Sequence, residues 1–121
     1  MTTDSEMSMI TALIRPHMEG HVVRALHDLP EFPGFTFSEV RGQGRGGGAG
    51  GSYVSTVADL TYHHFVELRL VCRSRDVDEI RDRIASAAWT GRKGDGVVFV
   101  TPIHAFGRIR EIGKRPEKRD D

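Results

Sequence analysis

Three glycines and two arginines in the last third of the chain have the types and spacing of an anion-binding site. Gly91, Gly94 and Gly96 share one short stretch, and Arg108 and Arg110 lie in a following segment. Glycine lets backbone N–H groups approach an anion closely, and guanidinium groups pair with phosphate oxygens. A Gly-Asp-Gly turn before a strand also forms an ordinary tight connection, so this stretch alone predicts phosphate binding only weakly.

Hydrophobic periodicity predicts two strand–helix–strand units that position these residues. Asp76 and Glu79 have the spacing of a capping box, which predicts the start of the second helix, and Gly91 is expected to end it. Two such units with right-handed crossovers give a ferredoxin-like βαββαβ sandwich of the α+β class. Its uncovered sheet face predicts self-association. The expected strands span residues 10–14, 35–41, 65–72 and 97–101, and the expected helices span residues 18–29 and 76–90.

Composition limits the classes of function. The 121 residues include 17 basic and 17 acidic side chains, so no net charge attracts the chain to nucleic acid or anionic lipid. The single Cys72 excludes an intrachain disulfide and agrees with a reducing compartment. No apolar stretch has the length of a signal peptide or membrane span. We therefore expect one cytoplasmic domain over residues 9–114, with a flexible extension at residues 1–8 and a solvated tail at residues 115–121.

A glycine-rich loop over residues 42–62 separates the two units. Six of the nine residues from Gly42 to Gly50 are glycine, so few side chains are available for packing. A loop of this length inside a small domain is usually functional or disordered, and we expect it to be mobile in the free protein.

Four segments in order resemble the PII signal-transduction proteins, and the resemblance covers about residues 9–114. The segments are Ile14–Pro16, Thr36–Arg45, Thr90–Val100 and Arg108–Arg110. The resemblance implies a homotrimer of ferredoxin-like subunits that binds an adenine nucleotide (ADP, AMP or ATP) between neighbouring subunits. It further implies that the long loop controls a protein partner, such as a membrane transporter or a metabolic enzyme, and that the chain is not an enzyme.

The same resemblance assigns roles to individual residues. Thr36 is expected at the base, Arg45 and the two later arginines at the phosphates, and the glycines where the backbone passes close to the ligand. The implied nucleotide-binding residues are Thr36, Gly42, Gly44, Arg45, Gly94, Asp95, Gly96, Arg108 and Arg110.

Several positions depart from the pattern of family members that bind ATP with 2-oxoglutarate. Val97 stands where those members carry a phosphate-binding lysine, Gly46 replaces a glutamine, and Phe65 replaces a lysine that pairs with the keto acid. Tyr53 and Tyr62 lie outside the usual setting of the modified loop tyrosine. These departures predict a divergent PII-like protein that binds ADP or AMP at least as well as ATP, rather than a standard nitrogen sensor.

Histidines provide an alternative interpretation, a metal-responsive PII-like sensor linked to a cation efflux or other transporter. His17 and His21 are four residues apart on the first expected helix, and His63 and His64 are adjacent after the loop. Neighbouring strand residues point to opposite faces, so a zinc ion bound by both His63 and His64 of one subunit is disfavoured. A ligand set assembled across the trimer, which Cys72 or Glu67 could join, stays open, and His104 is instead a candidate for the nucleotide cleft. Surface histidines remain the simpler interpretation.

Two other classes of function have weaker support. No carboxylate pair, nucleophile elbow or P-loop ending has the spacing of an active site, which disfavours an enzyme. Ferredoxin-like folds also bind RNA, but the second and third expected strands lack the aromatic pattern that stacks bases. We therefore expect neither nucleic-acid binding nor direct membrane insertion.

Overall fold

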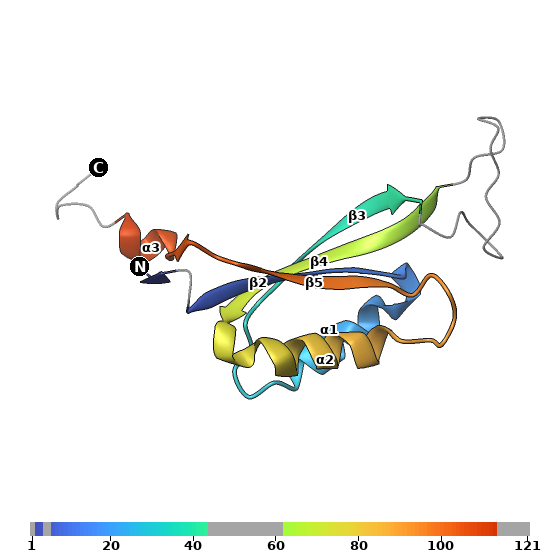
Figure 1. Cartoon of the computed structure of the whole chain (residues 1–121), viewed down its shortest axis with the longest axis horizontal. Helices are drawn as coiled ribbons and strands as arrows, with labels where there is room; N and C mark the ends of the chain where they lie inside the picture. The colour runs from blue at the N-terminus through green and yellow to red at the C-terminus, as the bar shows by residue number, and fades with distance from the viewer. Residues whose placement is uncertain (1, 4–5, 44–61, 114–121) are drawn as a thin grey trace.

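The computed structural model describes residues 2–3, 6–43 and 62–113 and contains a four-stranded antiparallel sheet with two helices on one face (Figure 1). The strand order is β3-β4-β2-β5. This order, with the helices between the strands in sequence, confirms the ferredoxin-like α+β fold. The strands are β2 (Met7–Ile14), β3 (Thr36–Gly42), β4 (His63–Arg73) and β5 (Gly96–Pro102), and the helices are α1 (Glu19–His27) and α2 (Val77–Ala88).

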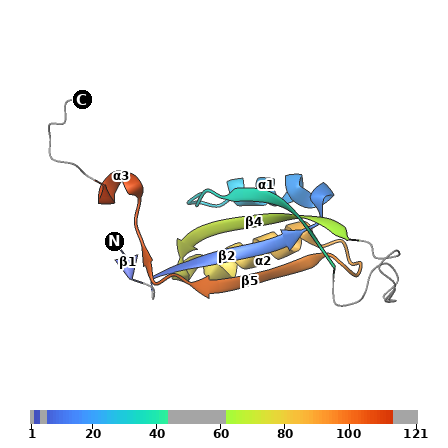
Figure 2. The same ribbon diagram turned by 90° about the horizontal axis from the view of Figure 1, so that it is seen from above.

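Short elements connect the strands to the helices and extend the molecule beyond the main sheet. The 3-10 turns η1 (Pro16–Met18) and η4 (Ser74–Asp76) precede α1 and α2. At one end, β1 (Thr2–Thr3) pairs with β6 (Ala105–Phe106), and helix α3 (Ile109–Ile112) follows. In Figures 1 and 2, α3 lies at the end of the sheet opposite the connection between α2 and β5.

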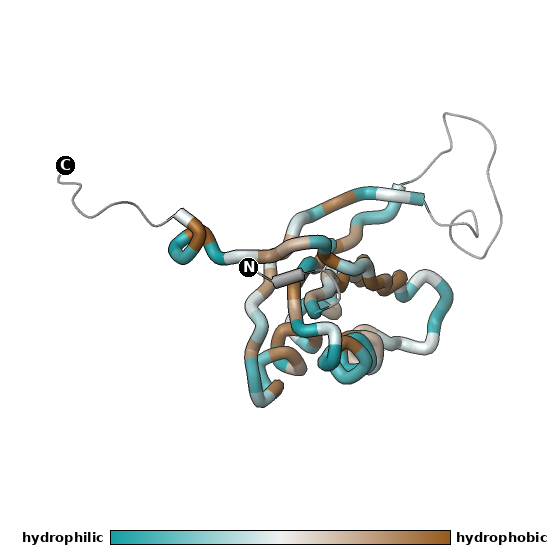
Figure 3. The backbone as a smooth tube through the Cα atoms, turned by 60° about the vertical axis from the view of Figure 1, so that its left-hand side comes forward, coloured by the Kyte–Doolittle hydropathy of each residue, from teal (hydrophilic) through white to brown (hydrophobic). Residues whose placement is uncertain are grey.

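The core lies between the sheet and the helices because alternate residues of the central strands are apolar. Ile10 of β2 is opposite Leu70 of β4, and Ala12 is opposite Leu68. These four side chains are at most 3% exposed, and Ile84 of α2 packs against them. Figure 3 shows apolar segments gathered in the middle of the molecule, whereas the apolar residues of α3 lie away from this core.

The other face of the sheet is also rich in apolar side chains. Val97 and Phe99 of β5 alternate with the core-facing residues and are 57% and 48% exposed. Leu13 and Thr11 of β2 are their cross-strand partners. Seen from above in Figure 2, the strands lie in front of α1 and α2, so neither helix covers this face.

The start of α2 corrects the predicted capping box. Asp76 occupies the N-cap position but makes no side-chain hydrogen bond to the helix. Glu79 instead pairs with Arg83 one turn later at 3.2 Å. The preceding η4 turn positions the helix start without this motif. At the other end, α2 stops at Ala88 rather than near Gly91, because Trp89 has an extended backbone.

The N-terminal boundary also differs from the expected extension over residues 1–8. Strand β2 begins at Met7, and both Met7 and Ser8 are buried. Ser8 is tolerated there because its hydroxyl hydrogen-bonds the hydroxyl of Ser74 at 2.7 Å. The expected tail at residues 115–121 lies outside the described residues, as does most of the expected loop.

Candidate functional site

The turn between α2 and β5 is organised by one carboxylate, that of Asp95. Its Oδ2 accepts hydrogen bonds from the N–H groups of Thr90 at 2.7 Å and Gly91 at 3.1 Å. Its Oδ1 accepts bonds from the Thr90 hydroxyl and from Nε of Arg15, the latter at 3.1 Å. Both oxygens are therefore occupied within the protein, so Asp95 holds the turn closed rather than facing an external ligand.

Glycine is needed on each side of Asp95 for a different structural reason. Gly94 has φ +84° and Gly96 has φ +115°, and residues that carry a side chain rarely adopt this backbone conformation. A Cβ on Gly96 would also lie 1.8 Å from the carbonyl oxygen of Leu13. Gly96 is therefore required where β5 meets β2, whereas Gly94 lies on the turn itself.

The closed turn leaves a run of backbone donors unused. Among the described residues, the N–H groups of Lys93 and Gly94 make no hydrogen bond, whereas the N–H of Asp95 closes the turn. Successive N–H groups around a left-handed glycine form a concave site that suits an anion. The turn can therefore hold a phosphate or carboxylate group through its main chain.

The charge of Asp95 gives this turn a defined pH dependence. Hydrogen bonds from Thr90, first its hydroxyl and then its N–H, lower the pKa of Asp95 from 3.8 to about 2, with smaller contributions from Arg15 and Gly91. A depressed native pKa stabilises the fold above the unfolded value, and this stabilisation is lost as the pH falls from about 4 to about 2.

We expect Asp95→Asn to lower the free energy of unfolding near neutral pH. The difference from wild type should shrink as the pH falls from about 4 towards 2, because wild-type Asp95 then becomes protonated. Urea unfolding across this range measures the effect, with Asp82→Asn on the exposed surface of α2 as the control. A difference that stays constant with pH would contradict the assigned role of the carboxylate.

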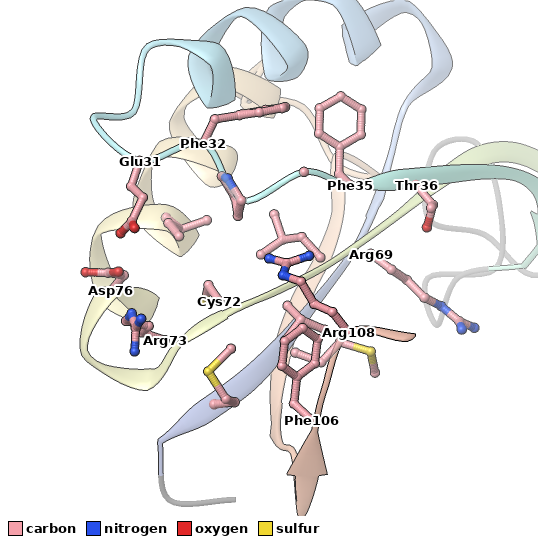
Figure 4. Close-up of a pocket in the computed structure, with 17 residues that line it drawn as sticks. Glu31, Phe32, Phe35, Thr36, Arg69, Cys72, Arg73, Asp76, Phe106 and Arg108 are labelled. Carbon is pink, nitrogen blue, oxygen red and sulfur yellow. The ribbon is translucent and has the colours of Figure 1, made fainter. Parts of the chain in front are cut away.

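A second group of predicted residues lines a pocket of about 530 Å³ beside β4. Arg108 extends over this pocket near Phe106, whose ring centre lies 5.7 Å from its guanidinium carbon (Figure 4). Thr36 lies on the same pocket, opposite Arg69 of β4. Arg108 and Arg110 have no carboxylate partner within 4 Å among the described residues. Their guanidinium groups are thus available to an anionic ligand.

The structure separates the turn from the arginines. Gly96 pairs with Ile14 at one end of the sheet, whereas Arg108 follows the opposite end of β5 and lines a pocket with Met7. A seven-residue strand spans about 20 Å. One phosphate group therefore cannot contact both groups within a single chain.

The remaining predicted nucleotide residues fall at the turn's end of the sheet or outside the described residues. Gly42 ends β3 opposite His63, at the end of the sheet where β2 and β5 pair through Ile14 and Gly96. Gly44 and Arg45 lie outside the described residues, together with Gly46 and Tyr53. β3 ends and β4 begins at the same end of the sheet as the turn that carries Gly94, called the Gly94 turn below (Figure 1).

The described residues hold no group of three or more metal-ligating side chains. His17, His21 and His64 are exposed, and the ring of His63 lies 6.5 Å from that of Phe65. Burial and, secondarily, the Asp76 carboxylate raise the pKa of Cys72 to about 11, which disfavours the thiolate that a metal requires. The geometry therefore adds no support to the metal-sensor alternative.

Comparison with known proteins agrees with the fold and the motifs. The family described as Nitrogen regulatory protein P-II matches residues 7–112. The chain belongs to this P-II family. Nitrogen regulatory protein P-II of Microchaete diplosiphon is 34% identical over 111 residues, and that of a Synechocystis species is 35% identical; each alignment covers 92% of this chain and 98% of the relative.

A solved P-II structure supports the same assignment. The Arabidopsis thaliana PII bound to citrate matches with a TM-score of 0.71 and 28% identity, over 94% of this chain and 92% of that one. P-II proteins are signal-transduction regulators, so the predicted family and regulatory class are confirmed. None of the helices in the described segments is long and apolar enough to cross a membrane.

Sequence reasoning missed Arg15 as part of the P-II turn. Its bond to Asp95 joins residues 80 positions apart, and only the pairing of Ile14 with Gly96 brings them together. Arg15 was noted as part of the Ile14–Pro16 motif, but residue type alone gave it no role.

Proposed function

We propose that the chain is a trimeric regulator that binds an adenine nucleotide in clefts formed between copies. The separation of the Gly94 turn from Arg108 and Arg110 carries this proposal, because each group can contact an anion and neither is complete alone. A ring of identical copies places one surface of each copy against a different surface of the next. The turn of one copy then faces the arginines of its neighbour.

The apolar sheet face supports association of copies. Val97 and Phe99 are about half exposed, and Leu13 and Val71 lie on the same face. Burial of apolar surface contributes about 25 cal/mol per Å², which favours contact between such faces. Membership of the P-II family, whose members are trimeric regulators, makes three copies the expected assembly.

The ligand class follows from the groups that would contact it. The main-chain N–H groups of Lys93 and Gly94 and two guanidinium groups suit a phosphate chain, and Thr36 lies beside a pocket that can receive the base. The citrate in the Arabidopsis PII structure is a small multivalent anion, which is compatible with such donors. Val97 provides no cation at the turn, so ADP or AMP is expected to bind at least as well as ATP.

Regulation would act through the segment between β3 and β4. The end of β3 and the start of β4, which flank it, lie at the end of the sheet that holds the Gly94 turn (Figure 1). A phosphate bound at the turn would therefore change which conformations of the segment are populated, and with them the affinity for a protein partner. We infer a membrane transporter or a metabolic enzyme as the partner, a cytoplasmic location, and no enzymatic activity of the chain itself.

Calorimetry with ADP and adenosine tests the proposal. ADP should bind saturably with one site per chain, and adenosine should bind far more weakly because it lacks the phosphates that the turn and arginines contact. Sedimentation in the same buffer should give the mass of three chains. Equal affinity for the two compounds, or no ADP binding at millimolar concentration, would contradict it.

A further inference from the structure

Arg15 lies directly after β2 and makes two contacts with the Gly94 turn. Its Nε donates to Oδ1 of Asp95 at 3.1 Å, and its Nη2 donates to the carbonyl oxygen of Lys93 at 2.5 Å. The Arg15 and Asp95 side chains are 28% and 20% exposed. The guanidinium group therefore bridges two points of the turn and is directed into the protein.

Asp95 passes this contact on to the beginning of the turn. The same carboxylate accepts hydrogen bonds from the N–H groups of Thr90 and Gly91, and the Thr90 hydroxyl accepts one from the N–H of Arg92 at 3.2 Å. Arg15 thus restrains the start and the end of the turn through one shared partner. Within this turn, the N–H groups of Lys93 and Gly94 make no hydrogen bond to the described residues.

The backbone at Arg15 is suited to this role. Arg15 has φ −68° and ψ 139°, the extended conformation that a following proline imposes, and Pro16 follows it. Because β2 pairs with β5 up to Gly96, the extended backbone brings the side chain to the turn. The guanidinium group also passes close to Gly94, where a Cβ would lie 3.2 Å from Nη2.

We propose that Arg15 is a positioning residue that sets the anion affinity of the Gly94 turn without contacting the anion. It holds the Asp95 carboxylate against Thr90 and Gly91 and also binds the Lys93 carbonyl, which fixes the backbone that carries the N–H groups of Lys93 and Gly94. Arginine is required because a planar fork reaches a carboxylate and a carbonyl together, whereas a lysine ammonium is a single point charge. This inference rests on the proposed nucleotide site.

Hydrogen exchange in the free protein tests the restraint. Arg15→Gln should raise the exchange rates of the Thr90 and Gly91 amides about tenfold, since a charge-assisted bond is lost, while exchange at Leu68 in the core stays unchanged. Arg24→Gln, an exposed arginine on α1, should change neither rate. Unchanged exchange at Thr90 and Gly91 in Arg15→Gln would overturn the proposal.

A double-mutant cycle with ADP as the probe distinguishes positioning from direct contact. Arg15→Gln alone should weaken ADP binding about tenfold, and Arg15→Lys should recover only part of the loss. In an Asp95→Asn background, Arg15→Gln should add little, because the restraint is already broken. An equal loss in both backgrounds would show that Arg15 contacts the phosphate itself and would overturn the proposal.

The two arms also separate this inference from the proposed function. If wild-type protein does not bind ADP, the proposed nucleotide site is wrong, and hydrogen exchange alone decides whether Arg15 restrains the turn. If ADP binds and the exchange rates at Thr90 and Gly91 do not respond to Arg15→Gln, the nucleotide site stands and the positioning role is wrong.

Discussion

Gly96→Ala is expected to destabilise the fold by about 3 kcal/mol or more, because it combines backbone strain with a backbone clash. The residue has φ +115°, and its added Cβ would lie 1.8 Å from the Leu13 carbonyl oxygen. Neither atom belongs to a flexible side chain, so β5 must move away from β2 at this point. Urea unfolding at a fixed chain concentration measures the change.

Gly20→Ala is the matched control for this substitution. Gly20 lies within α1, and nothing surrounds its Cβ position within 4 Å. Alanine at this position should stabilise the protein by a few tenths of a kcal/mol, less than the helix-interior value of about 0.5–1 kcal/mol, because Gly20 lies in the first turn of α1. Equal stability of the Gly96→Ala and wild-type proteins would contradict the close approach of the Gly96 backbone to the Leu13 carbonyl oxygen.

Replacing both Arg108 and Arg110 by glutamine is expected to weaken ADP binding by about a hundredfold or more, since each charge-assisted contact contributes about 1.5–3 kcal/mol. Both side chains are exposed and lack a carboxylate partner among the described residues, so the fold should tolerate the change. Calorimetry gives the affinity, and thermal unfolding without ligand should be nearly unchanged.

A control with the same change in charge uses Arg81→Gln and Arg83→Gln. These α2 arginines pair with carboxylates on the same helix. Their removal should leave ADP affinity within about twofold of wild type, because exposed charges distant from a ligand are largely screened. A loss as large as that of the Arg108 and Arg110 variant would attribute the effect to net charge alone.

The elements were predictable from sequence because hydrophobic periodicity reports which side of a strand or helix faces the core. Ile10, Leu68 and Ile84 all lie in the core as the pattern indicates. Boundaries were less predictable where a polar residue is buried with a partner. Ser8 belongs to β2 because Ser74 satisfies its hydroxyl, and that pairing depends on two segments 66 residues apart.

The candidate site was predictable in its residue types but not in its arrangement. Glycines and arginines indicated an anion, and the structure shows why Gly94 and Gly96 are glycine. The role of Asp95 was less visible, because a carboxylate in a turn gives no sign that its partners are Thr90 and Arg15. The distance between turn and arginines depends on the length and direction of β5, which only the assembled sheet displays.

Mixing two defective variants measures most directly whether the site lies between copies. One variant carries Arg108→Gln with Arg110→Gln; the other carries Gly94→Asp, which places a negative charge at the turn on a residue type that tolerates positive φ. After joint refolding at equal concentration, about a quarter of the clefts should combine an intact turn with intact arginines and bind ADP. Recovery of this fraction is the predicted result. A mixture that binds no more ADP than the separate variants would contradict a cleft shared between copies.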